Sequence, residues 1–209
     1  TTSESEAVFY FPGCGSERLF SQVGLATQAM LWHAGVQTVL PPGYLCCGYP
    51  QRGSGQFDKA EKMITDNRVL FHRVANTLNY LDIKTVLVSC GTCYDQLQDY
   101  RFEDIFPGCR IIDIHEYLLE KGITLSDSRS VGGEARSQKD PGGYLYHDPC
   151  HSPMKLQEPM KTVKALVGNN VLKNERCCGE SGTLGVTRPD ISTQVRFRKE
   201  EELRKGEAA

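Results

Sequence analysis

The feature that most constrains this chain is a pair of adjacent cysteines followed by glycine, which occurs twice. Cys46 and Cys47 form the first pair, and Cys177 and Cys178 form the second. Consecutive Cα atoms lie about 3.8 Å apart, whereas an unstrained disulfide needs roughly 4.4–6.8 Å between its Cα atoms. Each pair must therefore either bond elsewhere or direct both thiolates at one centre.

The nine cysteines of this 209-residue chain occur without a recognisable export signal, because the first residues, TTSESEAVFYF, lack the basic segment of a signal peptide. Secreted disulfide frameworks usually have an even cysteine count in a smaller, loop-rich chain. We therefore expect a cytoplasmic protein. Its cysteines are expected to bind a metal or cluster; redox-active thiols are the second alternative and plain buried thiols the third. Cys109 alone has the surroundings of a solitary buried cysteine.

Charge and hydropathy exclude two further classes. The net charge of −2 does not provide the basic surface of a nucleic-acid-binding protein. No apolar run approaches the roughly 20 residues that span a bilayer. The missing initiator Met and the charged final stretch, RKEEELRKGEAA, lead us to expect a fragment of a longer polypeptide.

Strand-like and helix-like patterns alternate along the chain, which predicts an α/β fold with a mostly parallel sheet. We expect Pro41 to Gly55 to be a loop, and Trp32, Phe71, Tyr94 and Tyr100 to be core or partial-core aromatic residues. The expected strands are 8–11, 36–40, 85–88, 110–114, 144–146 and 171–173, and the expected helices are 19–33, 57–81, 115–121, 159–167 and 190–205.

An internal repeat divides the chain. The order strand, cysteine, helix, strand and Cys-Cys-Gly occurs in residues 1–121 and returns in 144–209, and the Ser- and Gly-rich stretch 122–143 is expected to be a linker or surface loop. Cys14, Cys90 and Cys150 each follow a predicted strand directly. Because sites in parallel sheets form beyond the carboxyl ends of the strands, these cysteines should gather at one edge.

The first module contains five candidate ligands, one more than tetrahedral zinc or a cubane [4Fe–4S] cluster requires. The extra thiol could bridge irons, remain spare or act as a reactive thiol. A sulfur-only set disfavours magnesium, calcium and manganese. This first cysteine set consists of Cys14, Cys46, Cys47, Cys90 and Cys93.

The second module contains three candidate ligands, the second cysteine set of Cys150, Cys177 and Cys178. The spacing of the first module places a closing C-x-x-C at about position 221, beyond residue 209. His147 and His151 flank Cys150 and could complete a zinc site. Loop histidines that make hydrogen bonds are the favoured interpretation of both.

The motifs YFPGC, LCCGYP, VSCGTC, YHDPCH and RCCGESGTLG resemble the cysteine-rich CCG domains of heterodisulfide reductase, the glycolate oxidase iron–sulfur subunit and lactate-utilisation proteins. The resemblance implies two pseudo-repeated Rossmann-like modules at the end of an electron path. It implies that the first cysteine set holds an iron–sulfur cluster of the [4Fe–4S] type. Whether that cluster is noncubane, as in heterodisulfide reductase, is left open. The second set is partial, and zinc or a smaller cluster occupies one set in some relatives.

The stretch PDISTQVRFRKEEELRKG further resembles the C-terminal part of large FAD-linked oxidases. It implies a flavin-containing oxidase domain or subunit as partner, with FAD outside this chain, and other iron–sulfur carriers as further partners. Glycines flank the cysteines, where backbone would pass close to a cluster and offer N–H groups to its sulfurs. They are Gly13, Gly15, Gly48, Gly91 and Gly179.

Three functions follow as hypotheses. The first is an electron-transfer domain of a flavin-linked oxidoreductase that oxidises a substrate such as a 2-hydroxy acid, so that whether this chain is itself an enzyme stays open. The second is a catalytic disulfide-reducing site that uses the same five thiols. The third is a zinc-bound structural or assembly module with no enzymatic role.

Overall fold

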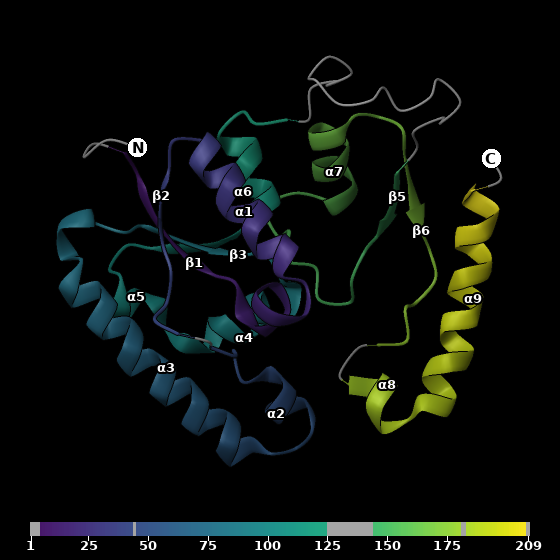
Figure 1. The fold of residues 1–209 in the computed structure, drawn as a ribbon, viewed down its shortest axis with the longest axis horizontal. Helices are drawn as coiled ribbons and strands as arrows, with labels where there is room; N and C mark the ends of the chain where they lie inside the picture. The colour runs from purple at the N-terminus through teal and green to yellow at the C-terminus, as the bar shows by residue number, and fades with distance from the viewer. Residues whose placement is uncertain (1–4, 44, 125–143, 181–182, 208–209) are drawn as a thin grey trace.

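The computed structural model describes residues 5–43, 45–124, 144–180 and 183–207, and Figure 1 shows their arrangement. Most of the expected linker, 125–143, lies outside the described residues. The strands are β1 (Ala7–Phe11), β2 (Gln37–Val39), β3 (Thr85–Val88), β4 (Arg110–Asp113), β5 (Tyr144–His147) and β6 (Val171–Asn174). The α-helices are α1 (Ser21–His33), α2 (Tyr49–Gly53), α3 (Phe57–Thr77), α4 (Gly91–Leu97), α5 (Phe102–Ile105), α6 (Ile114–Glu120), α7 (Pro159–Val167), α8 (Leu184–Thr187) and α9 (Pro189–Glu207).

Four parallel strands form the main sheet in the order β2-β1-β3-β4. In the β1–β3 register, Val8 lies opposite Thr85 and Phe11 lies opposite Val88, so both strands end at the same level. The chain leaves β1 toward β2 on one side and later returns to β3 on the other side. The gap between the carboxyl ends of β1 and β3 is therefore the topological switch point of the sheet, where ligands of such folds bind.

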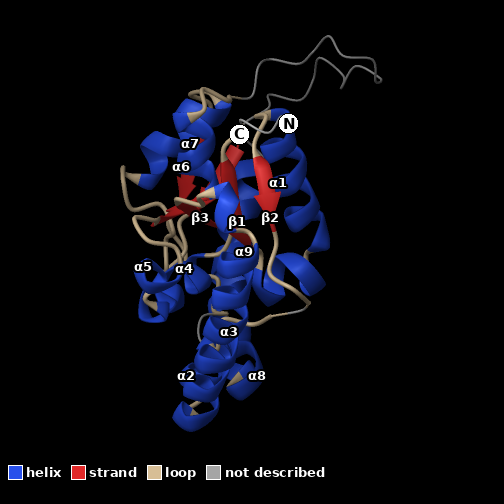
Figure 2. Cartoon of the chain, turned by 90° about the vertical axis from the view of Figure 1, so that its left-hand side faces the viewer, coloured by secondary structure: helices blue, strands red, loops and turns tan. Residues whose placement is uncertain are grey.

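Strand β1 is the centre of the core because helices cover both faces of the sheet (Figure 2). Its side chains alternate between two hydrophobic clusters, as the two-residue period of a strand requires. Phe9 and Phe11 pack with Phe71 in one cluster, and Val8 and Tyr10 pack in the other. All five residues of β1 are buried, which explains why the strand reads as an uninterrupted apolar run.

The second module has a smaller sheet in which β5 and β6 pair in parallel. Its order of β5, α7 and β6 repeats the order of β1, α1 and β2. Helix α7 packs against α6, which joins the second module to the first (Figure 1). The predicted α/β fold of two pseudo-repeated Rossmann-like modules with parallel sheets is confirmed.

Several expected boundaries were wrong. The segment 41–55 is not loop throughout, because α2 begins directly after Gly48, and the helix expected from Leu19 begins at Ser21 after a π-helical turn over Gly15–Leu19. The long helix expected to reach Leu81 ends at Thr77, and a 3-10 turn follows. Short helices lack the several periods that sequence patterning needs to reveal them.

One aromatic prediction was wrong and three were confirmed. Phe71 and Tyr100 are fully buried, and Tyr94 is partly buried against the core, whereas Trp32 is 69% exposed. Helix α1 turns Gly24 and Thr27 inward together with Leu31. The indole of Trp32 follows Leu31 and is left on the solvent side.

No helix in the described part of the chain is both long and apolar enough to cross a membrane.

Candidate metal centre

The five cysteines of the first set come from three loops that meet beyond the sheet. Cys14 follows β1, Cys90 follows β3, and Cys93 lies in the first turn of α4. Cys46 and Cys47 close the loop that runs from β2 to α2. Because β1 and β3 are neighbours, the fold brings Cys14 and Cys90 to the switch point, as the position of each behind a strand predicts. Cys150, which was expected at the same edge, instead follows β5 of the other sheet.

The thiols of the first set form a continuous row. The sulfurs of Cys46 and Cys14 are 3.8 Å apart, the thiol of Cys47 interacts with those of Cys46 and Cys93, and the thiol of Cys93 also interacts with that of Cys90. Cys47 and Cys93 are buried, and the other three are partly exposed. The row therefore has a buried centre and accessible ends.

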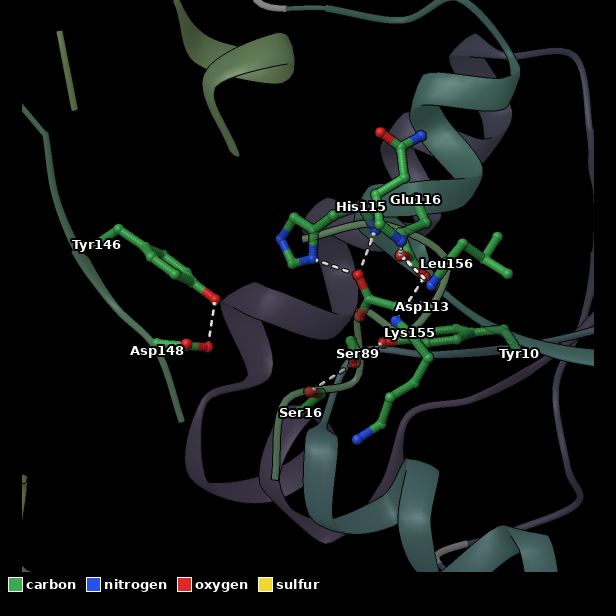
Figure 3. A network of polar contacts seen from close by, with 11 residues as sticks. Tyr10, Ser16, Ser89, Asp113, His115, Glu116, Tyr146, Asp148, Lys155 and Leu156 are labelled. Carbon is green, nitrogen blue, oxygen red and sulfur yellow. Dashed lines mark hydrogen bonds and ion pairs between the residues drawn. The ribbon is translucent and has the colours of Figure 1, made fainter. Parts of the chain in front are cut away.

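Hydroxyl groups tie two of these loops together. The Oγ atoms of Ser16 and Ser89 lie 2.9 Å apart, and Ser89 also lies 2.8 Å from the hydroxyl of the buried Tyr10. Figure 3 shows this chain of three hydroxyls. Since Ser16 follows Cys14 by two residues and Ser89 precedes Cys90, the chain fixes the spacing of the loops that carry these cysteines.

Two glycines let the backbone approach the thiols. Gly13 has φ = 65°, and a Cβ atom there would lie 2.7 Å from the sulfur of Cys93. Gly48 has φ = 92° and starts α2 directly after the cysteine pair; glycine adopts this left-handed region at little cost. Gly15 has no atom within 4 Å of such a Cβ, so the expected close approach does not occur there.

The thiols differ in their preferred protonation state. Hydrogen bonding from the Cys93 thiol, with backbone N–H groups of Cys93 and Thr92, lowers the pKa of Cys90 to about 6 against the opposing effect of burial. Contacts with Cys46 and then Cys93 likewise lower the pKa of Cys47. Contacts with Cys47 and Cys90 raise the pKa of Cys93, and contact with Cys46 and burial raise that of Cys14.

This division of the row into thiols and thiolates follows from crowding, because like charges at short distance disfavour ionisation of all members together. A bound cation removes that restriction, since metal ligation requires thiolates. The donor set therefore fits a thiolate-bound metal group.

Among the described residues, no three His, Cys, Asp or Glu side chains converge on the position of a single metal ion.

Two residues that the sequence patterns did not assign to the site, Asn67 and Tyr100, hold the Cys46-Cys47 backbone by hydrogen bonds. The side-chain amide of Asn67 on α3 donates to the carbonyl oxygen of Cys46 at 2.8 Å and to the hydroxyl of Tyr100 at 2.8 Å. The Tyr100 hydroxyl donates in turn to the carbonyl oxygen of Cys47 at 3.0 Å. The available signal was a polar Asn67 in line with Ala60, Ile64 and Phe71 on the buried face of α3.

The second cysteine set is more open. Cys150 and Cys177 are exposed, Cys178 is partly buried, and the backbone N–H of Gly179 donates to the sulfur of Cys177 at 3.4 Å. The flanking histidines make hydrogen bonds, as expected. His147 lies 2.9 Å from the ammonium of Lys199, and His151 contacts Asp95 and Tyr49 of the first module. Zinc at this set stays a prediction.

An open pocket of about 300 Å³ is lined by residues that lie close in sequence to Cys14 and Cys46. Pro12 and Ser16, on either side of Cys14, form one part of its wall, and Pro41 and Gly43, on the loop that leads to Cys46, form another. Leu25 and Leu40 make it largely apolar. Cys14 and Cys46 do not themselves line the pocket.

Comparison with known proteins decides the family. The profile of the cysteine-rich domain called CCG matches residues 8–98 and 144–209. The chain belongs to the CCG cysteine-rich domain family. The two matched stretches contain all eight cysteines of the first and second sets, and the family expected from the motifs is confirmed.

This CCG protein is similar to iron–sulfur proteins. It is 28% identical over 94% of its length to a protein named as a subunit of fumarate reductase (CoM/CoB) from Methanothermobacter marburgensis, of which it spans 37%. It is 25% identical over 90% of its length to lactate utilization protein A of an Exiguobacterium strain, of which it spans 77%. It is 23% identical to a probable glycolate oxidase iron–sulfur subunit of Bacillus subtilis, over 90% of this chain and 43% of that protein. No solved structure matches the chain.

Proposed function

We propose that this CCG protein is an iron–sulfur electron-transfer domain and that Cys14, Cys46, Cys47, Cys90 and Cys93 hold its cluster. The observation that carries the proposal is the row of five thiols, gathered from three loops at the switch point of the sheet. Relatives named as iron–sulfur proteins support the same chemistry. Such a cluster would accept and return single electrons when bound.

The protein's own groups prepare the thiols for ligation. Cys47 and Cys90 have lowered pKa values and supply thiolates, whereas Cys14 and Cys93 have raised pKa values and must release protons on ligation. Backbone N–H groups of Tyr49 and Thr92 point at the sulfurs of Cys47 and Cys90. Hydrogen bonds of this kind tune the potential of a thiolate-bound cluster.

The partner in this proposal is a flavin-containing oxidase domain or subunit, with FAD held outside this chain. A 2-hydroxy acid is the proposed substrate of that partner, because relatives carry the names lactate utilization protein and probable glycolate oxidase iron–sulfur subunit. Other iron–sulfur carriers would take the electrons onward. The cluster type, cubane or noncubane, is open in the proposal.

Anaerobic reconstitution of the chain with iron and sulfide tests the proposal. The expected result is iron and acid-labile sulfide bound in equal amounts, absorption near about 400 nm, and an electron paramagnetic resonance (EPR) signal in one oxidation state. Replacing Cys47 or Cys93 by Ser should abolish the signal. Zinc as the only metal in anaerobically prepared protein would reject the proposal in favour of a structural or assembly module.

The pocket beside Cys14 favours one second candidate, a catalytic disulfide-reducing site. Its wall contains Pro12 and Ser16, which lie on either side of the partly exposed Cys14 in the sequence, and a disulfide bound there would lie near the cluster. Reduction of one disulfide to two thiols consumes two electrons and two protons.

The two candidates differ in turnover. A cluster-loaded sample with an artificial electron donor should reduce heterodisulfide substrates if the site is catalytic. Absence of thiol release, while the same sample exchanges electrons with a redox dye, leaves electron transfer as the function.

A further inference from the structure

The 148–157 loop of the second module lies directly on the C-x-x-C turn of the first. A Cβ atom at Gly91, between Cys90 and Cys93, would overlap the carbonyl oxygen of His151 and would lie 2.7 Å from its carbonyl carbon and 3.2 Å from Cδ of Pro153. These distances are shorter than ordinary van der Waals contact, which begins at 3.4 Å. Two backbone segments from different modules therefore meet at the residue between two thiols of the first set.

The imidazole of His151 joins the two helices that follow the cysteines. Its Nδ1 atom contacts the carboxylate of Asp95, which lies two residues after Cys93 on α4. Its Nε2 atom lies 3.3 Å from the hydroxyl of Tyr49, the first residue of α2 and the second after Cys47. The rings of His151 and Tyr49 also meet edge to face at 5.4 Å. One side chain thus spans the distance between the Cys46-Cys47 turn and the Cys90–Cys93 turn.

The loop that carries His151 is itself anchored. The buried carboxylate of Glu116 on α6 accepts backbone N–H groups of Leu156 at 2.7 Å, Gln157 at 3.1 Å and Lys155 at 3.2 Å. Figure 3 shows Glu116 facing this loop. The ammonium of Lys155 also lies 3.8 Å from the carboxylate of Asp95. Fixed to α6 at one end, the loop holds His151 in place over α4.

We propose that His151 is a positioning residue of the first cysteine set, acting through Tyr49 and Asp95 to fix the separation of its two halves. The proposal rests on the proposed function in that these thiols hold the cluster. It assigns the second module a role at the first module's centre that its own cysteines do not require. A shift of α2 relative to α4 would move Cys47 relative to Cys93, because α2 begins two residues after Cys47 and α4 contains Cys93.

The test uses the full chain with His151→Ala, His151→Asn and Tyr49→Phe, and with His33→Ala as the matched control on the exposed end of α1. His151→Asn keeps a donor toward Asp95 and loses the reach to Tyr49. The first readout is the alkylation rate of buried Cys93 in the metal-free protein, measured by mass spectrometry with Cys109 as internal reference. The second is the EPR spectrum and midpoint potential after reconstitution.

We expect His151→Ala to raise the relative alkylation rate of Cys93 about tenfold, as loss of one charge-assisted hydrogen bond would. Its EPR spectrum and potential should change, His151→Asn should lie between it and wild type, and His33→Ala should match wild type. If His151→Ala does not fold, Tyr49→Phe decides, because it removes only one hydroxyl. Wild-type values for Cys93 labelling, EPR spectrum and potential in the folded variants would overturn the positioning role.

Failure of the two proposals gives different results. A wild-type protein that takes up no iron rejects the proposed function, while the alkylation of Cys93 in the metal-free protein still tests the role of His151. A wild-type protein that assembles a cluster, together with a His151→Ala variant identical to it, leaves the proposed function standing and rejects the positioning role.

Discussion

Substituting Gly91 by Ala tests whether the second module is seated on the first cysteine set. The new methyl carbon would overlap the carbonyl oxygen of His151 and lie 2.7 Å from its carbonyl carbon, against an ordinary contact of 3.4 Å or more, so the backbone of the loop must withdraw by more than roughly an ångström. Overpacking of this kind costs about 1–3 kcal/mol. Disturbing the bond between His151 and Asp95 adds a cost of about 1.5–3 kcal/mol, and the higher helix propensity of Ala returns at most about 1 kcal/mol.

The net loss should be about 3 kcal/mol, which lowers the melting temperature of a chain of this size by roughly 6–12 °C. Differential scanning calorimetry of the metal-free protein measures it. Gly15→Ala is the matched control, because Gly15 also follows a cysteine but has nothing within 4 Å of an added Cβ; its melting temperature should stay within about 3 °C of wild type. Equal melting temperatures for the two variants would refute the seating of His151 on Gly91.

Three further predictions concern the thiols and their supports. At pH 7, Cys90 should be alkylated about 100-fold faster than Cys109. The pKa of Cys90 is about 6, whereas burial and then Glu103 raise the pKa of Cys109 to about 11, so the ionised fraction of Cys90 is about 10⁴ larger. The thiolate of Cys90 is less basic and therefore less nucleophilic, which reduces this advantage by about 10². The Cys90 rate should rise with pH through about 6 and then level off. Asn67→Ala should cost about 1–3 kcal/mol by leaving the Cys46 carbonyl without its donor, and should weaken iron uptake. Glu116→Ala should cost about 1.5–3 kcal/mol, seen in urea unfolding, because three N–H groups lose a charged acceptor.

Each of these three predictions has a control, which is either a second cysteine in the same alkylation experiment or a substitution on the same helix. Equal rates for the two cysteines at pH 7 would contradict the thiolate assignment. Asn76→Ala, at an exposed position of α3, should leave stability and iron uptake near wild type. Glu120→Ala, also on α6, removes a surface ion pair with Arg110 of β4, which is worth about 0–1 kcal/mol. A loss of stability as large as that of Glu116→Ala would show that the hydrogen bonds from Glu116 to the loop add no stability of their own.

The strands were the most predictable part of the fold. The run Val8 to Phe11 is apolar at every position because helices cover both faces of β1, and a strand buried on both sides has that signature. The short helices α2 and α4 were missed as elements, because five and seven residues do not show a helical period. The cysteine motifs next to these two helices were nevertheless recognised from the sequence as candidate ligands.

The candidate ligands were predictable because their meaning lies in local order. A cysteine directly after a strand, a Cys-Cys-Gly step and a C-x-x-C turn each indicate thiolate ligands within a few residues. The internal repeat indicates which of these cysteines belong to the same set. Asn67 and Tyr100 were not predictable as a site, since each acts by hydrogen bonding to a carbonyl that is distant in the sequence.

The sequence by itself determined the family, the alternation of strands and helices, and the five thiols that can serve one centre. Only the tertiary structure decided how those thiols meet, with Cys47 and Cys93 in the buried middle and Cys14 at a partly exposed end. It also decided that His151 lies against the first cysteine set, on Gly91, Tyr49 and Asp95. The physical reason is that ligand identity is encoded by neighbours along the chain, whereas position is set by packing between modules, through contacts of residues about 60 to 100 positions apart.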